Sequence, residues 1–139
     1  MTEDEINKII NIKHTVTAVI LNRKNQVLGV SRKDDHTKFG LVGGKVEDTD
    51  DTLEDAIERE VLEETGLDID SSSMVEIVSG MSGGYMGHTF LIMDWGGEIQ
   101  TDEPHIVKWT NFDELIRGSF GEWNTKVKEN LQSIGINIV

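Results

Sequence analysis

Residues 59–67, REVLEETGL, constrain the fold of this 139-residue chain more than any other stretch. Gly66 is a natural stop for a helix and is followed at once by the apolar Leu67, so a helix is expected to end here. At about 100° per residue, the preceding apolar residues gather on one side of this helix, which should therefore be buried. They are Leu53, Ala56, Ile57 and Val61.

The same apolar arc also contains carboxylates. Glu60 and Glu64 fall inside the arc, and Glu63 lies on its edge. The other acids of the helix point the opposite way; they are Glu54, Asp55 and Glu58. A buried carboxylate must be paired, protonated or bound to a metal, because an isolated buried charge is too costly. Arg59 is the nearby base, and one guanidinium does not neutralise three glutamates.

Two interpretations of this acidic helix compete. A dense run of acids is usually a solvated helix face, but the position inside the apolar arc favours a metal site. Carboxylate ligands suit hard cations, so we expect Mg²⁺ or Mn²⁺. A calcium loop of the EF-hand type is excluded, because Leu53 stands where that loop needs glycine and Arg59 where it needs glutamate.

Composition limits the classes of protein and partner. The length suits one domain, 1–139, and the net charge of −13 argues against binding a nucleic-acid polymer or an anionic membrane. Cysteine is absent, no apolar run could span a bilayer, and the N-terminal MTEDEINKII lacks the basic start of a signal peptide. We therefore expect a cytoplasmic protein, either a monomer or a homodimer.

Strand-like segments surround the acidic helix. They are residues 14–21, 26–32, 39–46, 74–81, 87–95, 98–101 and 105–109. Residues 22–25 predict a hairpin between the first two, and Gly83 and Gly84 predict a turn. The acidic helix should begin near Asp51 or Thr52, each of which has an acid three residues on.

Two further helices are expected at residues 111–118 and 122–135, from the spacing of their apolar residues. Residues 1–12 fit a short helix or an extra strand, and the pattern leaves both open. Many strands with one central and one C-terminal helix predict an α+β fold. In such a fold a mixed sheet is covered by helices on its faces, as in an α-β-α sandwich.

Gly44, a spacer, Asp51 and then residues 59–67 resemble the signature box of the Nudix hydrolases. The second half of the box matches that family's pattern of an arginine, three glutamates and a glycine at every fixed position. Two departures occur in the first half: the loop Lys45–Asp50 has one residue more than the family's five, and Asp51 stands for the family's first glutamate. We expect a locally altered loop and an intact set of glutamates.

The resemblance implies a fold, a metal and catalytic residues. It implies the Nudix fold, with the acidic helix as the central catalytic helix. Glu60, Glu63 and Glu64, with the carbonyl of Gly44, would hold Mg²⁺ or Mn²⁺. Arg59 would orient the glutamates by pairing with them, unless it forms a plain surface ion pair. The general base would be Glu63 or Glu103, and the alternative for Glu103 is a turn residue before Pro104.

Several residues are candidates for substrate binding. They are Arg32, Lys45, Tyr85, His88, Phe120, Glu122, Trp123 and Asn124. Arg32 and the adjacent Lys33 suit phosphates, although a solvated basic pair would look the same. Tyr85 and His88 flank glycines and would either contact a base or cover a sheet edge. The remaining histidines, His14, His36 and His105, show no metal-binding spacing and are interpreted as structural.

The segment before the C-terminal helix predicts a nucleobase site. Asn124 or Glu122 would read the edge of the base while Phe120 or Trp123 stacks on it. In triphosphate-cleansing Nudix enzymes the base pocket is drawn partly from the segment that this one resembles. The alternative is that both aromatic residues pin the terminal helix to the sheet.

The resemblance implies metal-dependent hydrolysis of a nucleoside diphosphate linked to another group. The expected substrate is a nucleotide, a small molecule, and the leading reaction converts a (deoxy)nucleoside triphosphate to the monophosphate and pyrophosphate. The alternatives are hydrolysis of ADP-ribose or a nucleotide sugar, or a nucleotide sensor without activity. Sensors commonly lose glutamates of the box, whereas Glu60, Glu63 and Glu64 are all present.

Overall fold

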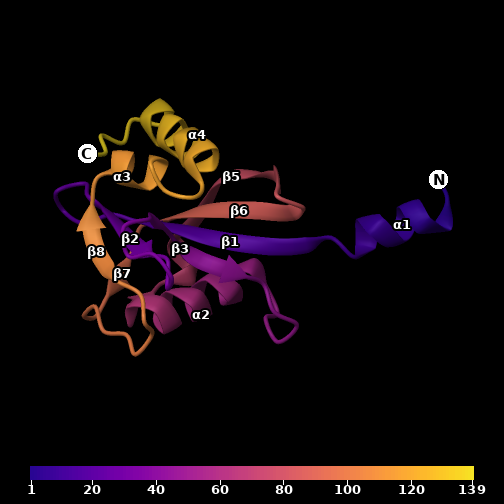
Figure 1. Cartoon of the computed structure of the whole chain (residues 1–139), viewed down its shortest axis with the longest axis horizontal. Coiled ribbons are helices and arrows are strands. Elements are labelled where there is room, and N and C mark those ends of the chain that lie inside the picture. The colour runs from indigo at the N-terminus through magenta and orange to yellow at the C-terminus, as the bar shows by residue number, and fades with distance from the viewer.

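The computed structural model describes the backbone of residues 1–139 and all side chains except those of residues 7–10. Six strands form one sheet in the order β5-β6-β1-β3-β2-β8 (Figure 1). In chain order they are β1 (Lys13–Ile20), β2 (Val27–Ser31), β3 (Phe39–Lys45), β5 (Met74–Ser82), β6 (Tyr85–Ile92) and β8 (Val107–Thr110). β1 and β6 run parallel and the other neighbouring pairs run antiparallel, so the sheet is mixed, as predicted.

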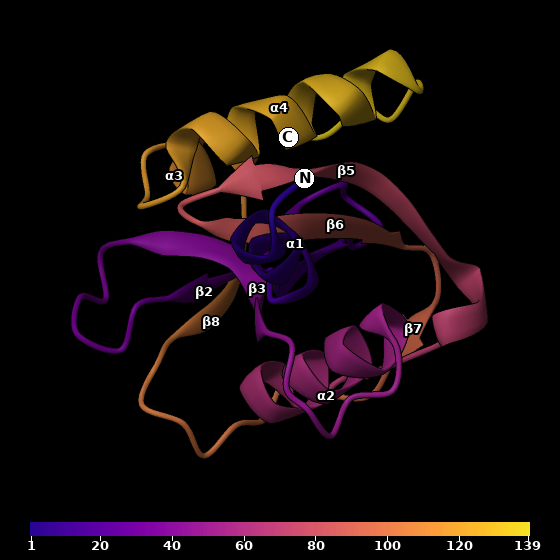
Figure 2. The ribbon, with the colours of Figure 1, turned by 90° about the vertical axis from the view of Figure 1, so that its right-hand side faces the viewer.

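Helices cover both faces of this sheet. Helix α2 (Leu53–Thr65) lies on one face, and α3 (Phe112–Ile116) and α4 (Gly121–Ser133) lie on the other (Figure 2). Successive residues of the central strand β1 therefore enter different cores. Val16 packs in the cluster that contains Ile57 of α2, whereas Val19 packs in the cluster that contains Leu131 of α4. The predicted α-β-α sandwich is confirmed.

The predicted hairpin between the first two strands forms only at its turn. Leu21 and Val27 make an antiparallel bridge, and Asn22 N donates to Gln26 O at 3.1 Å. Beyond this turn the pairing is not that of a hairpin, because β3 lies between β1 and β2 and pairs with both. In that position β3 satisfies backbone groups along both of its edges. The turn at Gly83 and Gly84 does join a paired hairpin, β5 and β6.

The predicted strand at 98–101 is also wrong. The amide of Gln100 donates to the carbonyl oxygen of Thr65, the last residue of α2, at 2.7 Å. This segment therefore caps a helix and does not extend a sheet. Nearby, β4 (Asp68–Ile69) and β7 (Trp95–Gly96) form a separate two-stranded sheet, with a short helix η1 (Ser71–Ser73) following β4.

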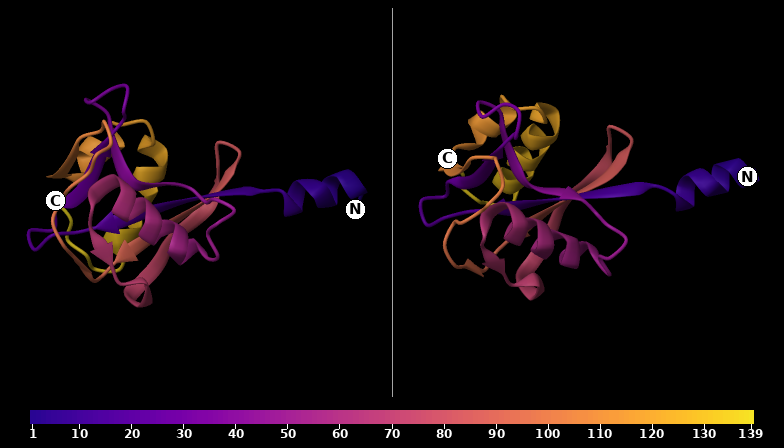
Figure 3. Two further views of the ribbon diagram at one scale, coloured as in Figure 1. Left: turned by 90° about the horizontal axis from the view of Figure 1, so that it is seen from below. Right: turned by 60° about the horizontal axis from the view of Figure 1, so that its bottom comes forward.

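The N-terminal segment is a helix, α1 (Glu3–Ile10), which resolves the choice that the sequence left open. It continues into the start of β1 and extends beyond the sandwich (Figure 3). Within the described residues, no helix combines the length and the apolar character needed to cross a bilayer.

Candidate active site

Helix α2 begins and ends at residues that its sequence predicts. Thr52 is the N-cap, and its hydroxyl accepts a hydrogen bond from the amide of Asp55 at 3.0 Å. Gly66 ends the helix in the left-handed conformation, with φ of 79°, and its amide donates to Leu62 O. Local capping therefore fixes the length of the helix that carries the three glutamates.

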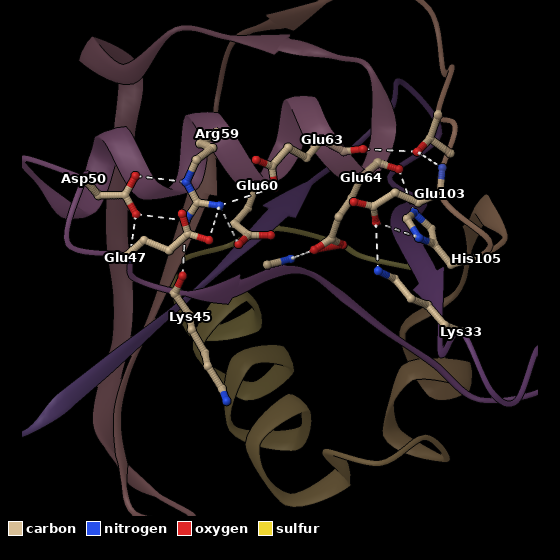
Figure 4. Close-up of polar contacts among 12 residues, drawn as sticks. Lys33, Lys45, Glu47, Asp50, Arg59, Glu60, Glu63, Glu64, Glu103 and His105 are labelled. Carbon is tan, nitrogen blue, oxygen red and sulfur yellow. Dashed lines mark hydrogen bonds and ion pairs between the residues drawn. The ribbon is translucent and has the colours of Figure 1, made fainter.

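Arg59 lies at the centre of an ion-pair network at the first half of α2 (Figure 4). Its Nε and Nη2 donate to the two carboxylate oxygens of Asp50 at 2.9 and 2.8 Å. Its Nη1 contacts Glu60 at 2.9 Å and Glu63 at 3.3 Å, and lies 3.6 Å from Glu47. The guanidinium holds the pKa of Asp50 below its usual range by hydrogen bonding. Arg59 thus joins the glutamates to the loop after β3.

Asp50, not Asp51, occupies the arginine-pairing position. The Asp50 side chain is only 5% exposed, whereas Asp51 is exposed. Five residues separate Gly44 from Asp50, which is the spacing of the Nudix box, so the extra residue lies between Asp50 and the helix. The prediction from the sequence took Asp51 for the family's glutamate, which keeps the family's seven residues before Arg59 and puts the extra residue in the loop Lys45–Asp50. Counting forward from Gly44 would have found Asp50.

Glu60 and Glu64 face inward, as the helical arc predicts. The Glu60 carboxylate lies directly over Gly44, where an added Cβ would come within 2.5 Å of Glu60 Oε1. Glu64 accepts a hydrogen bond from the amide of Gly43 at 3.3 Å. Burial, with the negative charge of Glu60 beside it, raises the pKa of Glu64 to about 9. Glu63, in contrast, is half exposed.

These residues fit a hard divalent cation by their chemistry. Glu64 is a buried carboxylate whose pairing with a cation would remove the cost of its burial. Gly44 leaves room for the Glu60 carboxylate beside its own backbone. In the present arrangement, no three acidic, histidine or cysteine side chains among the described residues already form a ligand group. Arg59 holds Glu60 and Glu63 in their places.

The segment of residues 100–105 closes the C-terminal end of α2. The last carbonyl groups of a helix lack partners within it, and here three in succession accept hydrogen bonds from this segment. Gln100 N donates to Thr65 O at 2.7 Å and Thr101 Oγ to Glu63 O at 3.1 Å. His105 Nε2 lies 2.7 Å from Glu64 O.

Glu103 lies within this segment. Its carboxylate contacts Lys33 Nζ at 3.5 Å and His105 Nδ1 at 3.2 Å (Figure 4). The negative charge of Glu103 also contributes to the raised pKa of Glu64, after burial and Glu60. His105 is nearly buried and touches both Glu103 and the backbone of α2, yet no spacing in the sequence marks it. The fold therefore brings the two candidate bases, Glu63 and Glu103, to the same helix end.

A cavity of about 770 Å³ opens beside these carboxylates. Glu60, Glu63, Glu64 and Glu103 line it, together with Gly44. An apolar wall comes from β3 and from the start of α4 and includes Phe39, Leu41, Phe120 and Trp123. Acidic side chains and an aromatic surface thus share one cavity.

Most predicted substrate-binding residues line this cavity. They are Arg32, Lys45, Tyr85, His88, Phe120, Trp123 and Asn124; the basic Lys33 and Lys38 lie there too. Glu122 is exposed and is absent from the lining.

Two basic side chains of the cavity, Arg32 and Lys45, have partners within the protein. The Arg32 guanidinium forms a two-point contact with Asp34, at 2.7 and 2.8 Å. The Lys45 ammonium lies 5.3 Å from the centre of the Tyr85 ring. Both cations are thereby given a preferred direction at the edge of the cavity.

The other candidates are tied more firmly to the fold. Asn124 is buried and donates through Nδ2 to Leu115 O at 3.2 Å. His88 is bonded at both ring nitrogens, with Nε2 2.9 Å from His14 Nδ1 and Nδ1 3.0 Å from Glu76 Oε1. Phe120, in contrast, is 65% exposed. Among the aromatic candidates, Phe120 is the most exposed side chain.

The model of the NUDIX domain matches residues 12–131. The chain therefore belongs to the Nudix family, and by class it is a hydrolase acting on phosphoric anhydrides.

The curated relatives of this chain are named for different substrates or more generally. The chain is 34% identical over 116 residues to an ADP-ribose pyrophosphatase of Methanocaldococcus jannaschii, covering 77% of this chain and 68% of that protein. It is 26% identical over 121 residues to an 8-oxo-dGTP diphosphatase of Buchnera aphidicola, covering 86% and 92%. A MutT-like protein of Streptomyces ambofaciens is 29% identical over 102 residues, which cover 73% of this chain and 65% of that protein. The match thus spans just under two thirds of that relative.

Solved structures agree in fold. A chain from a study of MutT from Aliivibrio salmonicida and Vibrio cholerae superposes with a TM-score of 0.70 at 23% identity. The match covers 88% of this chain and 99% of that one. The predicted Nudix fold, with its mixed sheet, central helix and C-terminal helix, is confirmed.

Proposed function

We propose that residues 1–139 act as one domain that hydrolyses the diphosphate linkage of a small nucleotide with Mg²⁺ or Mn²⁺. The leading reaction is cleavage of a nucleoside triphosphate to the monophosphate and pyrophosphate. The observation that carries this proposal is the single cavity in which inward carboxylates of α2 adjoin an aromatic wall. A diphosphate needs the first of these surfaces and a nucleobase needs the second.

Glu60, Glu63 and Glu64, with the carbonyl of Gly44, would hold the cation. When bound, a divalent cation neutralises charge on the diphosphate and lowers the pKa of a coordinated water. The chain itself carries a net charge of −13, so an anionic substrate needs cationic groups at the point of contact. Lys38 and Lys45 line the cavity and would meet the phosphate groups from the side of the protein.

Glu103 is the stronger candidate for the general base. Glu63 is occupied by Arg59 and is also a proposed ligand of the cation. Glu103 lines the cavity and is oriented by Lys33 and His105, so its carboxylate oxygen could accept a proton from the attacking water.

Phe120 and Asn124 are the proposed residues for the nucleobase. The exposed face of Phe120 suits stacking. Asn124 lines the cavity and uses its amide nitrogen on Leu115 O, which leaves its carbonyl oxygen for a donor on the base. Trp123 would form the wall rather than a stacking platform, because its ring already packs against Gly87, where an added Cβ would come within 3.0 Å of Trp123 Cη2. Glu122 is dropped from the proposal because it lies outside the cavity lining.

ADP-ribose or a nucleotide sugar is the second candidate substrate. It is favoured by the relative at 34% identity, which is named an ADP-ribose pyrophosphatase. A sensor without activity is disfavoured, because the three glutamates are present and face one cavity.

The test is release of pyrophosphate or phosphate, and of the nucleoside monophosphate, across a panel of nucleotides. The panel includes the common ribo- and deoxynucleoside triphosphates, ADP-ribose and nucleotide sugars, each with Mg²⁺, with Mn²⁺ and with EDTA. We expect metal-dependent turnover with one class clearly preferred. Absence of turnover on every member with both metals would refute the proposal.

A further inference from the structure

A chain of three polar side chains runs beneath the apolar part of the cavity. Trp123 Nε1 donates to Thr89 Oγ at 2.8 Å. Thr89 Oγ lies 2.7 Å from Thr17 Oγ. The three residues come from α4, β6 and β1, so the contact links the helix to two neighbouring strands.

The direction of the second hydrogen bond follows from proton counting. The indole nitrogen of Trp123 can only donate, so Thr89 Oγ accepts there. Thr89 is fully buried, and Thr17 Oγ is the one acceptor bonded to its hydroxyl among the described residues. An unpaired Thr89 proton in the core would lose a hydrogen bond at a place that water does not reach. Thr89 therefore donates to Thr17.

This direction leaves the hydroxyl proton of Thr17 unused. Thr17 lines the cavity, and no described side chain or carbonyl group accepts its proton. An accepted hydrogen bond also polarises a hydroxyl and strengthens it as a donor. The cavity thus presents one directed donor within a mainly apolar wall.

The position of the Thr17 hydroxyl is fixed by its neighbours. An added Cβ at Gly43 on β3 would come within 2.8 Å of Thr17 Cγ2, so the methyl group points to β3 and the hydroxyl to β6. Thr17 lies one position from Val16, which packs toward α2, so it faces α4. The hydroxyl is therefore on the side of Trp123, opposite the face that Glu60 covers.

We propose that Thr17 is a specificity-determining residue that donates a hydrogen bond to an acceptor atom of the nucleoside part of the substrate. The acceptor is an oxygen or a ring nitrogen of the base, or the 2′ oxygen of the ribose. This inference rests on the proposed function only in taking the ligand to be a nucleotide. Trp123 acts through Thr89 to fix the direction of the donor.

The test measures binding of nucleoside monophosphates by calorimetry in EDTA, so that neither metal nor turnover enters. AMP, GMP, CMP, UMP and their 2′-deoxy forms are titrated into the wild type, Thr17→Val and Thr17→Ser. We expect the wild type to prefer one nucleoside and Thr17→Val to bind that nucleoside about 10-fold more weakly. Thr17→Ser keeps the hydroxyl and should retain the preference.

The matched control is Thr125→Val, which removes a part-buried hydroxyl bonded to Gly121 O in α4, outside the cavity lining. It should keep the nucleoside preference, whereas Thr89→Val, which removes the hydrogen bond that directs the Thr17 hydroxyl, should weaken it. If Thr17→Val folds poorly, Thr17→Ala replaces it. A loss seen with a ribonucleotide but not with its deoxy form identifies the ribose 2′ oxygen, and a loss with both identifies the base; either outcome supports the proposal.

Equal weakening for every nucleotide, no weakening, or no binding of any nucleoside monophosphate by the wild type would overturn the assignment. The proposed function fails separately. If binding depends on Thr17 but no nucleotide is hydrolysed, the enzyme proposal is wrong and the Thr17 assignment stands. If hydrolysis occurs with a preference that Thr17→Val leaves unchanged, the Thr17 assignment is wrong.

Discussion

The two ends of helix α2 are stabilised in different ways. At the N-terminal end, the cap Thr52 bonds an amide three residues away, and Asp50 reaches Arg59 nine residues away. At the C-terminal end, Thr101 and His105 reach carbonyl groups 38 and 41 residues away in the sequence. The N-terminal end is therefore stabilised by residues close in sequence, and the C-terminal end by a segment far away in sequence.

The two ends of the helix therefore have different roles in the proposed site: one orients glutamates of the helix, and the other brings in Glu103 from a distant segment. The local network at the first half holds Glu60 and Glu63 through Arg59. The distant segment at the second half brings Glu103 to the helix end that carries Glu64, in the same step in which it caps that end. The catalytic proposal therefore depends on a helix cap that only the folded chain can supply.

The largest expected effect is on turnover. Glu63→Gln and Glu64→Gln should each lower kcat by about 100-fold or more, because both are proposed metal ligands and the loss of a ligand costs at least as much as the loss of its supporting residues. Glu58→Gln, on the exposed side of the same helix, is the matched control and should stay near wild type. Near-normal turnover of both variants at saturating Mg²⁺ would show that the metal does not bind to this helix.

The C-terminal end should also be sensitive to pH when metal is absent. Burial raises the pKa of Glu64 to about 9, so the folded protein binds this proton more tightly than the unfolded chain does. The free energy of unfolding in EDTA should therefore fall as pH rises from about 5 to 9. Glu64→Gln should flatten this slope, as denaturant titrations at several pH values would show. An unchanged slope in the variant would contradict the burial argument.

At the N-terminal end, Arg59→Ala should lower the free energy of unfolding by about 2–3 kcal/mol, because it leaves the nearly buried Asp50 without its partner. The pKa of Asp50 is lowered by Arg59, so the pair stabilises the protein above the unfolded value and loses its effect as pH falls below about 4. In Arg59→Ala, the part of the free energy of unfolding that falls below about pH 4 should therefore be missing. Equal stability at pH 7 would mean that the network orients side chains without stabilising the fold.

Gly66→Ala tests how closely the distant segment approaches the helix. Gly66 and Gly84 both have left-handed backbones, with φ of 79° and 84°, so either alanine variant pays a similar conformational cost of about 1–2 kcal/mol. Only at Gly66 would the new Cβ meet an atom, Gln100 O, at 2.2 Å. Gly66→Ala should be the more destabilising of the two by about 1 kcal/mol or more. Equal melting temperatures of the two variants would show that the segment around Gln100 moves away from Gly66 at little cost in stability.

The smallest effect is expected at Thr101. Its hydroxyl donates to Glu63 O and accepts from the amide of Glu103, so it joins the helix end to the proposed base. Thr101→Val should cost about 1 kcal/mol and lower kcat more than it raises KM. Thr125→Val removes a similar hydroxyl–carbonyl bond within α4 and should cost stability without the change in kcat. Equal kcat in the two variants would show that the hydrogen bonds of Thr101 at the helix end do not affect the activity of Glu103.

The sequence alone determined the features that depend on a few neighbouring residues. The helix ends at Thr52 and Gly66 follow from capping chemistry within one turn, and the inward direction of Glu60 and Glu64 follows from helical periodicity. Strand periodicity gave most of the sheet, and with it the layered fold. Even the position of Asp50 was readable, since its distance from Gly44 is a local count.

Only the tertiary structure decided which distant segments meet. No local pattern tells that β3 separates β1 from β2, that residues 98–101 cap a helix, or that His105 contacts Glu103. The chain of Trp123, Thr89 and Thr17 likewise joins three elements. Hydrogen-bond partners far apart in sequence are chosen by which arrangement satisfies the most buried polar groups at once, and that choice belongs to the whole fold.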